Sequence, residues 1–147
     1  MIIRTSTNND DFQKLVQSLD QYLRSLNGED NDFFAQYNKV DFIQHVIVIY
    51  QENIAVACGA IKAYNEDTME IKRMYTNPAV RGNGYGSQVL NALEEWSREL
   101  GYKRCILEMG KQQVSAEYLY RKNNYKVIPN YGQYQDIASS LCFEKIL

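Results

Sequence analysis

A glycine-rich stretch between a strand pattern and a long helical pattern constrains the fold and the ligand of this chain more than any other feature. Three glycines alternate with other residues in the run Arg81-Gly82-Asn83-Gly84-Tyr85-Gly86-Ser87. Glycine lets the backbone turn sharply and approach a ligand closely. A helix that begins here adds a partial positive charge of about half a unit at its first turn. The stretch therefore predicts a loop that binds a pyrophosphate at a helix N-terminus.

Two common phosphate-binding loops do not fit this stretch. A Walker loop requires a lysine directly before Ser or Thr, and no lysine follows these glycines. A dinucleotide-binding fingerprint requires a glycine at position 87, where this chain has serine, and too little chain follows for a doubly wound sheet. A nucleotide-binding phosphate loop is thereby disfavoured, and failure to bind ATP would exclude it.

The hydrophobic patterns on both sides of the loop predict an α+β order. Strand-like runs occupy residues 2–5, 46–50, 54–64, 69–76, 103–109, 125–128 and 141–147. Helical periodicity marks residues 10–28, 85–100 and 114–122. Residues 29–44 mix acids with aromatic side chains, which is compatible with a short second helix and a loop. Because the chain has 147 residues and 45% hydrophobic composition, we expect a single domain over residues 1–147.

Charge and composition exclude several classes of protein. The net charge of −2 lacks the positive excess typical of nucleic-acid binders, so nucleic acid is not an expected partner. No apolar run approaches the length of a membrane span, and the N-terminus lacks the apolar core of a secretory signal. We therefore expect no membrane association and a cytoplasmic location. The three cysteines lie in apolar runs without a CxxC pair, which predicts buried thiols and no metal site.

Two motifs together resemble those of the GNAT acyltransferase family. The first is Arg81-x-x-Gly84-x-Gly86, between a strand that ends before Pro78 and an amphipathic helix, and it is similar to the family's coenzyme A loop. The second is similar to the signature Ala-x-x-Leu-Tyr-x-x-x-Gly-Phe, and it reads Ala116-x-x-Leu119-Tyr120-x-x-x-Asn124-Tyr125. The resemblance covers the whole chain. It implies an α+β acyl-CoA N-acyltransferase fold, with a mixed, mostly antiparallel sheet of about six to seven strands flanked by about four helices.

The chain departs from the family pattern at three positions. Gln113 stands where many relatives have Asn, and its amide would remain available to the cofactor. Asn124 replaces the glycine, and we expect it to keep the same turn because asparagine tolerates a left-handed backbone. Tyr125 replaces the phenylalanine.

The resemblance implies acetyl-CoA as the co-substrate, bound between the strands at 69–76 and 103–109, with no metal. The edge of the first strand would pair with the pantetheine amides, and a backbone N–H there would stabilise the carbonyl oxygen during transfer. The expected cofactor-binding residues are Met74, Tyr75, Thr76, Arg81, Gly82, Asn83, Gly84, Tyr85, Gly86, Ser87 and Gln113.

Two side chains are expected to carry the chemistry. Glu70 lies where a family carboxylate often acts as the general base, and the alternative is a strand glutamate paired with Lys72. Glu108, on another strand, is the reserve candidate for the base. Tyr120 matches the family's acid tyrosine and would protonate the departing thiolate, and the alternative is core packing. His45 has no Ser or Cys neighbour in the sequence and is interpreted as a surface or capping residue.

The predicted function is direct transfer of an acetyl group from acetyl-CoA to a primary amine of a small molecule or a protein. Residues 1–70 carry a net charge of −6 and the remainder +4, which favours a small amine or a basic side chain as acceptor. The expected acceptor-binding residues are Phe33, Tyr37, Tyr131 and Tyr134. The sequence is compatible with a homodimer. The alternative function is a catalytically silent acyl-CoA sensor or regulatory module, which would bind the cofactor without turnover.

Overall fold

The structure is a computed structural model that describes residues 1–27 and 42–147. Seven strands form one sheet in the order β1-β2-β3-β4-β5-β7-β6. The strands are β1 (Ile2–Thr5), β2 (His45–Gln51), β3 (Ile54–Ala63), β4 (Thr68–Thr76), β5 (Arg104–Gly110), β6 (Lys126–Ile128) and β7 (Ser140–Ile146). Among the paired strands of the described residues, β4 and β5 alone run parallel. The expected mixed, mostly antiparallel sheet is confirmed.

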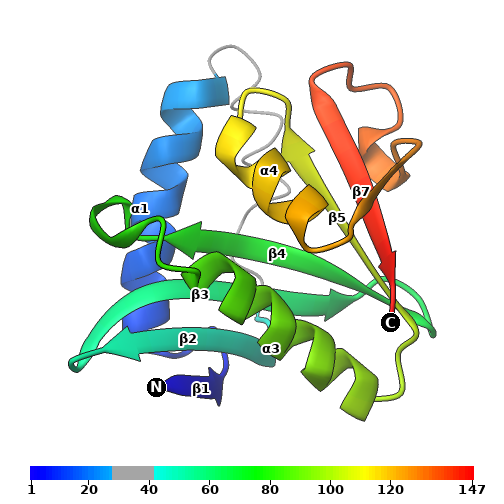
Figure 1. Cartoon of the computed structure of the whole chain (residues 1–147). Coiled ribbons are helices and arrows are strands. Elements are labelled where there is room, and N and C mark those ends of the chain that lie inside the picture. Colours follow the sequence, from blue (N-terminus) through cyan, green and yellow to red (C-terminus); the bar gives the residue numbers. More distant parts are fainter. Residues whose placement is uncertain (28–41) are drawn as a thin grey trace.

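Three α-helices of the described residues cover the two faces of the sheet. They are α1 (Asp10–Asn27), α3 (Tyr85–Glu99) and α4 (Val114–Lys122). Helix α1 packs on one face, and α3 and α4 pack on the other (Figure 1). Two short 3₁₀ turns, η2 (Pro78–Val80) and η3 (Gly132–Tyr134), precede α3 and β7. The short helix expected within residues 29–44 falls mostly outside the described residues.

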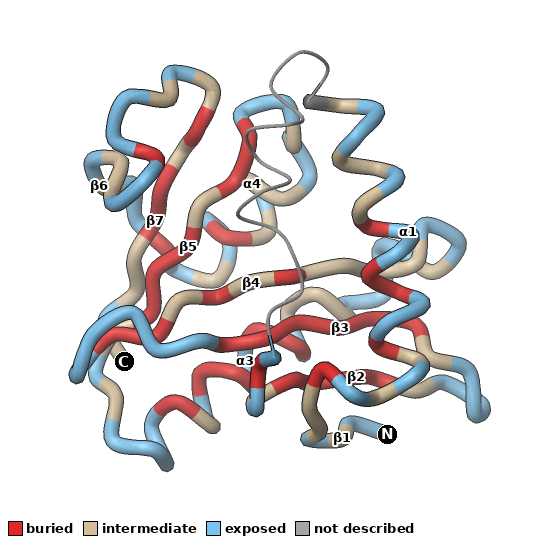
Figure 2. Tube along the Cα trace, turned by 180° about the vertical axis from the view of Figure 1, so that it is seen from behind, coloured by how far each residue is buried: buried red, intermediate tan, exposed pale blue. Residues whose placement is uncertain are grey.

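Burial on both faces explains the uninterrupted apolar run of β2. Ile47 and Ile49 belong to the core under α3, whereas Val46 and Val48 belong to the core under α1. A strand covered on both faces needs apolar residues at successive positions, not only at alternate ones. In Figure 2 long stretches of the central strands are coloured red for buried, as expected for strands covered on both faces.

The ends of the elements follow local turn chemistry. A two-residue loop joins β2 to β3, and both Glu52 (φ 51°) and Asn53 (φ 66°) have left-handed backbones, as a tight type I′ hairpin requires. The strand and helix boundaries expected from the sequence agree with the observed ones to within a residue or so. No helix in the described segments is long and apolar enough to cross a membrane.

Candidate active site

The sheet splits between β4 and β5, and this split creates the site. Their parallel ladder covers only three pairs, which run from Thr68 opposite Arg104 to Glu70 opposite Ile106. Beyond those pairs the two strands diverge (Figure 1). Among the described strands, none pairs with the edge of β4 from Ile71 onward on this side, and its backbone groups are open to a ligand. Two hollows lie along the split, and they share one wall.

A bulge in β4 places two successive side chains on the same face of the sheet. Cys58 of β3 faces Tyr75, and Ala60 faces Lys72, so the single residue between them on β3 opposes two residues of β4. Arg73, within the bulge, has a left-handed backbone at φ 59°, which is strained for an arginine. The extra residue brings the consecutive side chains of Lys72 and Arg73 to the face that α1 covers.

Gly59 lies on β3 opposite the bulge, at a position that has no room for a side chain. A Cβ atom at this position would lie 2.6 Å from Met74 Sδ and 2.6 Å from Val89 Cγ1. The absent side chain lets β4 with its bulge and helix α3 approach β3 closely. Met74 is thereby held at the split, where it contributes to both hollows.

The glycine-rich loop builds a cradle at the N-terminus of α3. Gly82 (φ 85°) and Gly84 (φ 81°) both have left-handed backbones, and a Cβ at either position would meet no protein atom within 4 Å. Gly84 is the N-cap of α3, and no side chain caps the first amides of this helix. Unpaired amides and the helix dipole favour an anion at this point. The loop therefore fits a phosphate group, as the sequence predicts.

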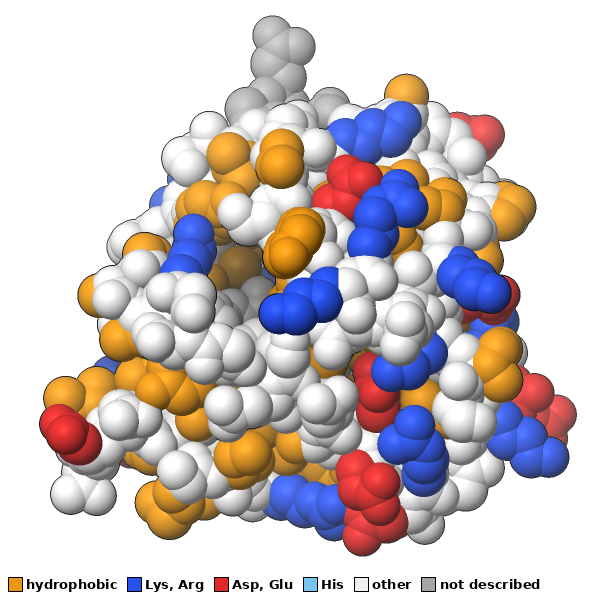
Figure 3. All heavy atoms as spheres, viewed as in Figure 1, with side chains coloured by type: hydrophobic (Ala, Val, Ile, Leu, Met, Phe, Trp, Pro, Cys, Tyr) orange, Lys and Arg blue, Asp and Glu red, His pale blue; other side chains and the backbone are white. Residues whose placement is uncertain are grey.

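The larger hollow, here called the cofactor groove, has a volume of about 360 Å³ and runs from this loop to the split. It is lined by every expected cofactor-binding residue except Asn83. Figure 3 shows the hollow with Lys or Arg side chains on both of its sides, and the cations among its lining residues are Arg81 and Lys122. This flanking positive charge suits the phosphates of coenzyme A.

Several loop side chains have structural partners within the chain. Asn83 donates from Nδ2 to the carbonyl oxygen of Val80 (2.8 Å), which explains why its side chain turns away from the groove. The Ser87 hydroxyl accepts a hydrogen bond from Asn123 Nδ2 (3.1 Å) at the end of α4. These contacts shape the loop, so the sequence prediction that both residues bind cofactor rests on their backbone atoms.

Gly86 has a packing reason to be glycine. A Cβ at this position would approach the side chain of Leu119 to 3.0 Å. The absent side chain therefore lets α3 and α4 lie close together beside the groove. The residues that line the groove and that sequence reasoning missed come mainly from α1 and α4, and they are Leu19, Tyr22, Ser115, Ala116, Tyr118, Leu119 and Lys122. Leu19 belongs to the apolar stripe of α1, a signal that indicates burial but not a ligand.

Tyr120 lies between the two hollows. Its ring is buried and borders both the cofactor groove and the smaller hollow. Burial raises the pKa of its hydroxyl, and the charge of Glu108 raises it further, so the proton stays on the oxygen at physiological pH. Asn124 follows α4 with φ 70°, which confirms the left-handed turn expected there. The Tyr120 ring packs edge-on against Tyr125, with ring centroids 5.9 Å apart.

Tyr125, which replaces the family's phenylalanine, forms a hydrogen bond inside the protein. Its hydroxyl donates to Glu94 Oε2 (2.9 Å), and Glu94 Oε1 accepts a hydrogen bond from Lys145 Nζ (2.8 Å). Glu94 is 2% exposed, so this carboxylate needs both partners. The extra hydroxyl of tyrosine relative to phenylalanine therefore completes a buried network behind Tyr120.

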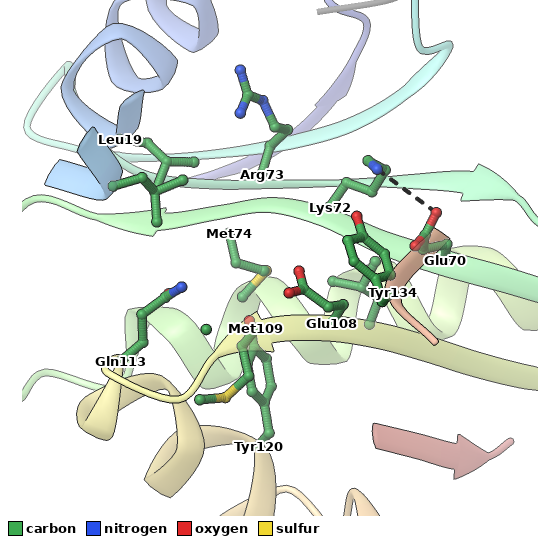
Figure 4. Close-up of a pocket in the computed structure, with 13 residues that line it drawn as sticks. Leu19, Glu70, Lys72, Arg73, Met74, Glu108, Met109, Gln113, Tyr120 and Tyr134 are labelled. Carbon is green, nitrogen blue, oxygen red and sulfur yellow. Dashed lines mark ion pairs between the residues drawn. The ribbon is translucent and has the colours of Figure 1, made fainter. Parts of the chain in front are cut away.

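The smaller hollow, here called the acceptor pocket, has a volume of about 80 Å³ and holds both candidate bases (Figure 4). Glu70 accepts a hydrogen bond from the Tyr131 hydroxyl at Oε2 (2.6 Å) and forms an ion pair with Lys72 at Oε1 (3.7 Å). Its side chain is only 12% exposed, so it is not a solvent-facing strand residue. The ion pair with Lys72 is the one that the alternative interpretation of Glu70 expects.

Glu108 lies across the split from β4, on β5. The Ser140 hydroxyl donates to its Oε2 (2.7 Å). Burial raises the pKa of this carboxyl to about 7, which the Ser140 hydrogen bond and the charge of Lys72 partly oppose. A carboxyl with a pKa near 7 exchanges its proton readily at physiological pH. Glu108 therefore has the electrostatic character of a general base.

The aromatic residues expected around the acceptor fall in different places. Tyr134 is buried and lines the acceptor pocket, whereas Tyr131 borders it indirectly, through its hydrogen bond to Glu70. Phe33 and Tyr37 lie outside the described residues. Sequence reasoning missed most of the pocket wall, namely Leu19, Leu23, Ile71, Lys72, Arg73, Met109 and Gly110. Most of these come from α1 and from β4, neither of which has a sequence motif.

The remaining candidates lie away from the two hollows. His45 packs edge-on against Trp96 (4.8 Å between ring centroids) and lines neither hollow. The three cysteines are buried free thiols, as expected, and burial raises the pKa of Cys58 to about 12. Within residues 1–27 and 42–147, no group of three or more His, Cys, Asp and Glu side chains is arranged to hold a metal ion.

A seven-stranded sheet that splits beside a glycine loop and a helix N-terminus defines an acyl-CoA N-acyltransferase fold. The Acetyltransferase (GNAT) family model matches residues 10–125. The chain belongs to this family and is an acyltransferase. "IAA acetyltransferase" of Azospirillum brasilense is 31% identical over 150 residues, which cover 99% of this chain and 97% of that protein.

Solved structures show the same fold. An acyl-CoA N-acyltransferase structure from Klebsiella pneumoniae superposes with a TM-score of 0.83 at 28% identity, covering 100% of this chain and 97% of the other. A GNAT acetyltransferase from Elizabethkingia anophelis, with acetyl-CoA bound, gives a TM-score of 0.72 at 15% identity, with coverage of 100% and 97%. The fold expected from the sequence is thereby confirmed.

Proposed function

We propose that this protein transfers an acetyl group from acetyl-CoA directly to a primary amine. The observation that carries the proposal is the shared wall of the two hollows. Leu19, Met74, Gln113 and Tyr120 each line both the cofactor groove and the acceptor pocket. An acyl group that enters from one hollow thus meets an amine that enters from the other, which is the juxtaposition that direct transfer needs.

The loop and the split strand supply the binding groups for acetyl-CoA. The amides at the N-terminus of α3 would hold phosphate oxygens, and Arg81 and Lys122 would add positive charge. The unpaired edge of β4 would hydrogen-bond the pantetheine amides, and a backbone N–H near Met74 would stabilise the carbonyl oxygen as it becomes negative. The expected roles of Met74, Tyr75 and Thr76 thus rest on main-chain atoms.

We assign Glu108 as the general base and keep Glu70 as the competing candidate. A lysine-like amine with a pKa near 10.4 costs about 4.6 kcal/mol to deprotonate at pH 7, so a base is needed. Both oxygens of Glu70 already face a partner, Tyr131 or Lys72. Glu108 accepts the Ser140 hydroxyl at Oε2, and burial raises its pKa to about 7. This difference supports Glu108.

The proposed reaction balances with two protein groups. Glu108 takes one proton from the bound ammonium, and the neutral nitrogen attacks the thioester carbonyl carbon. The nitrogen then loses its second proton to water. The carbon–sulfur bond then breaks, and the Tyr120 hydroxyl protonates the departing sulfur. The products are an amide and free coenzyme A, and proton exchange with water restores both side chains.

A binding experiment followed by a turnover experiment tests the proposal. Calorimetric titration with acetyl-CoA, beside coenzyme A, ATP and NAD, should give selective binding of the two coenzyme A compounds. Release of the coenzyme A thiol should then depend on an added amine, and mass spectrometry should find the acetylated amine. Binding without thiol release for any amine would instead favour the silent acyl-CoA sensor. Absence of binding would overturn the assignment of the groove.

A further inference from the structure

The carboxylates of the acceptor pocket already have hydrogen-bond donors. Glu70 receives the Tyr131 hydroxyl at 2.6 Å and faces the Lys72 ammonium at 3.7 Å. Glu108 receives the Ser140 hydroxyl at 2.7 Å. Figure 4 shows Glu70 and Lys72 on β4 facing one another across a short gap, with Glu108 on the neighbouring strand.

The cations of the same wall have donors to spare. Lys72 is 15% exposed, and in the described part of the chain its ammonium has one long ion pair, with Glu70, and no hydrogen bond. Arg73 is 5% exposed and bonds Asp20 of α1 through its two terminal nitrogens, at 3.1 and 3.4 Å. Its Nε is buried without a hydrogen-bond partner among the described residues. Buried donors without partners are costly, so they indicate a missing acceptor.

We propose that the acceptor is a small amine that also carries a carboxylate, and that this carboxylate binds at Lys72 and Arg73 while the amine faces Glu108. The inference rests on the proposed function and names the substrate class for that site. A carboxylate accepts several hydrogen bonds at once, which matches the spare donors of an ammonium and a guanidinium. The pocket volume of about 80 Å³ fits a compact molecule.

The arrangement of charges also opposes the alternative acceptors. A polyamine or a basic side chain would bring a second ammonium to a wall whose carboxylates Glu70 and Asp20 are already paired with Lys72 and Arg73, so it would compete with these cations for their partners. Lys72 and Glu108 line the same small pocket, so the two ends of the acceptor are close enough for a short spacer. The proposed acceptor is thus one of the small amines that the sequence predicts, with a carboxylate added.

Matched pairs of acceptors test this inference in the intact protein. Small amino acids such as glycine, alanine and serine are compared with their amides and with the amines that lack the carboxyl group. The amide's amine is less basic and hence more available as a nucleophile, so a preference for the acid cannot arise from basicity. We expect kcat/KM for the acid to exceed that for its partner by roughly 10- to 100-fold.

The same assay with Lys72→Met connects the preference to the proposed contact. This variant should lose most of the preference for the acid, whereas Lys126→Met, on the exposed edge strand β6, should keep it. Free carboxylates such as N-acetylated amino acids should inhibit the wild type, and Lys72→Met should resist them. If circular dichroism shows that Lys72→Met is unfolded, Lys72→Gln takes its place.

The outcomes separate the acceptor class from the function. Equal turnover of acids, amides and simple amines would overturn the acceptor class and leave acetyl transfer intact. A preference that survives in the Lys72 variant would overturn the contact. Binding of acetyl-CoA without turnover of any acceptor in the panel would overturn the proposed function, and the acceptor class with it.

Discussion

The cofactor groove and the acceptor pocket meet at one wall, yet they are built in different ways. The groove uses backbone: left-handed glycines, the free amides of α3 and the unpaired edge of β4. The pocket uses side chains from α1, β4, β5, α4 and η3, with buried charges at Glu70, Lys72, Arg73 and Glu108. A ligand common to the family needs only a fixed backbone, whereas selection of an acceptor needs side chains that differ from one member to another.

The largest effect on the contrast between groove and pocket is expected from removal of the proposed base in the pocket. Glu108→Gln should lower kcat/KM by about 10²- to 10⁴-fold, because an amide cannot take the proton of the amine. In the wild type, log kcat/KM should rise with pH through about 7 and then level off, since the base acts when ionised. The variant should lack this rise and still bind acetyl-CoA in calorimetry.

Glu70→Gln is the matched control for that experiment. It should lose less activity than Glu108→Gln and keep the pH-dependent rise, because its carboxylate binds Tyr131 and Lys72. A larger loss in Glu70→Gln, together with loss of the rise, would return the base to Glu70.

The second change acts at the shared wall. Tyr120→Phe should lower kcat by about 10²-fold and leave acetyl-CoA affinity nearly unchanged, because the hydroxyl would act in the transition state. Rapid-mixing thiol release and calorimetry measure the two quantities. Tyr102→Phe, before β5 and outside both hollows, is the control. Wild-type turnover in Tyr120→Phe would remove the residue from the acid role.

The third prediction concerns the free energy of unfolding, which the buried Glu108 carboxyl should make dependent on pH. The pKa of Glu108 is raised in the folded state to about 7, so its stabilising contribution is full at low pH and is lost as pH rises through 7. Relative to Glu108→Gln, the wild-type free energy of unfolding should therefore fall by an amount of order 2 kcal/mol between pH 4.5 and pH 8. Urea denaturation across this range would show it, and parallel curves would contradict the raised pKa.

The smallest effect is expected in the groove, where backbone matters most. Gly84→Ala and Gly101→Ala both place a side chain on a left-handed backbone with no protein atom within 4 Å. Each should lose about 1–2 kcal/mol of stability. Gly84→Ala alone should also weaken acetyl-CoA binding, by roughly tenfold, because its Cβ enters the cradle that the ligand approaches. Equal affinities in the two variants would contradict the loop assignment.

The contrast between a groove built from backbone and a pocket built from side chains explains which features the sequence could predict. The order of elements and the groove follow from local patterns: alternation in strands, periodicity in helices, and a loop motif whose glycines act within a few residues of one another. The pocket depends on contacts between distant parts of the chain. The hydrogen bond from Tyr131 to Glu70 spans 61 positions, and the ion pair of Arg73 with Asp20 spans 53. No local pattern encodes such pairings.

The bulge and Glu108 illustrate the same limit. A run such as Ile71-Lys72-Arg73-Met74 gives no sign that one residue will leave the ladder, because the cause lies at Gly59 on the neighbouring strand. The sequence favours Glu70 over Glu108, because the burial that raises the pKa of Glu108 cannot be predicted from a single strand. The bulge and the burial of Glu108 both depend on how the strands pack together, so neither can be predicted from one strand alone.

The three-pair ladder between β4 and β5 is also the point about which one half of the sheet would tilt against the other. Beyond it β4 continues for six residues, about 20 Å, to Thr76. Because β4 is paired with β3 as far as Thr76, any tilt would move the two strands together against β5. A relative tilt of about 5° at the ladder would change the separation at the Thr76 end by roughly 1.7 Å, but the separation of groups two residues past the ladder, such as Lys72 and Glu108, by only about 0.6 Å. Adjustment to a ligand would therefore be about three times smaller at the two candidate proton-transfer groups than at the far end of the split.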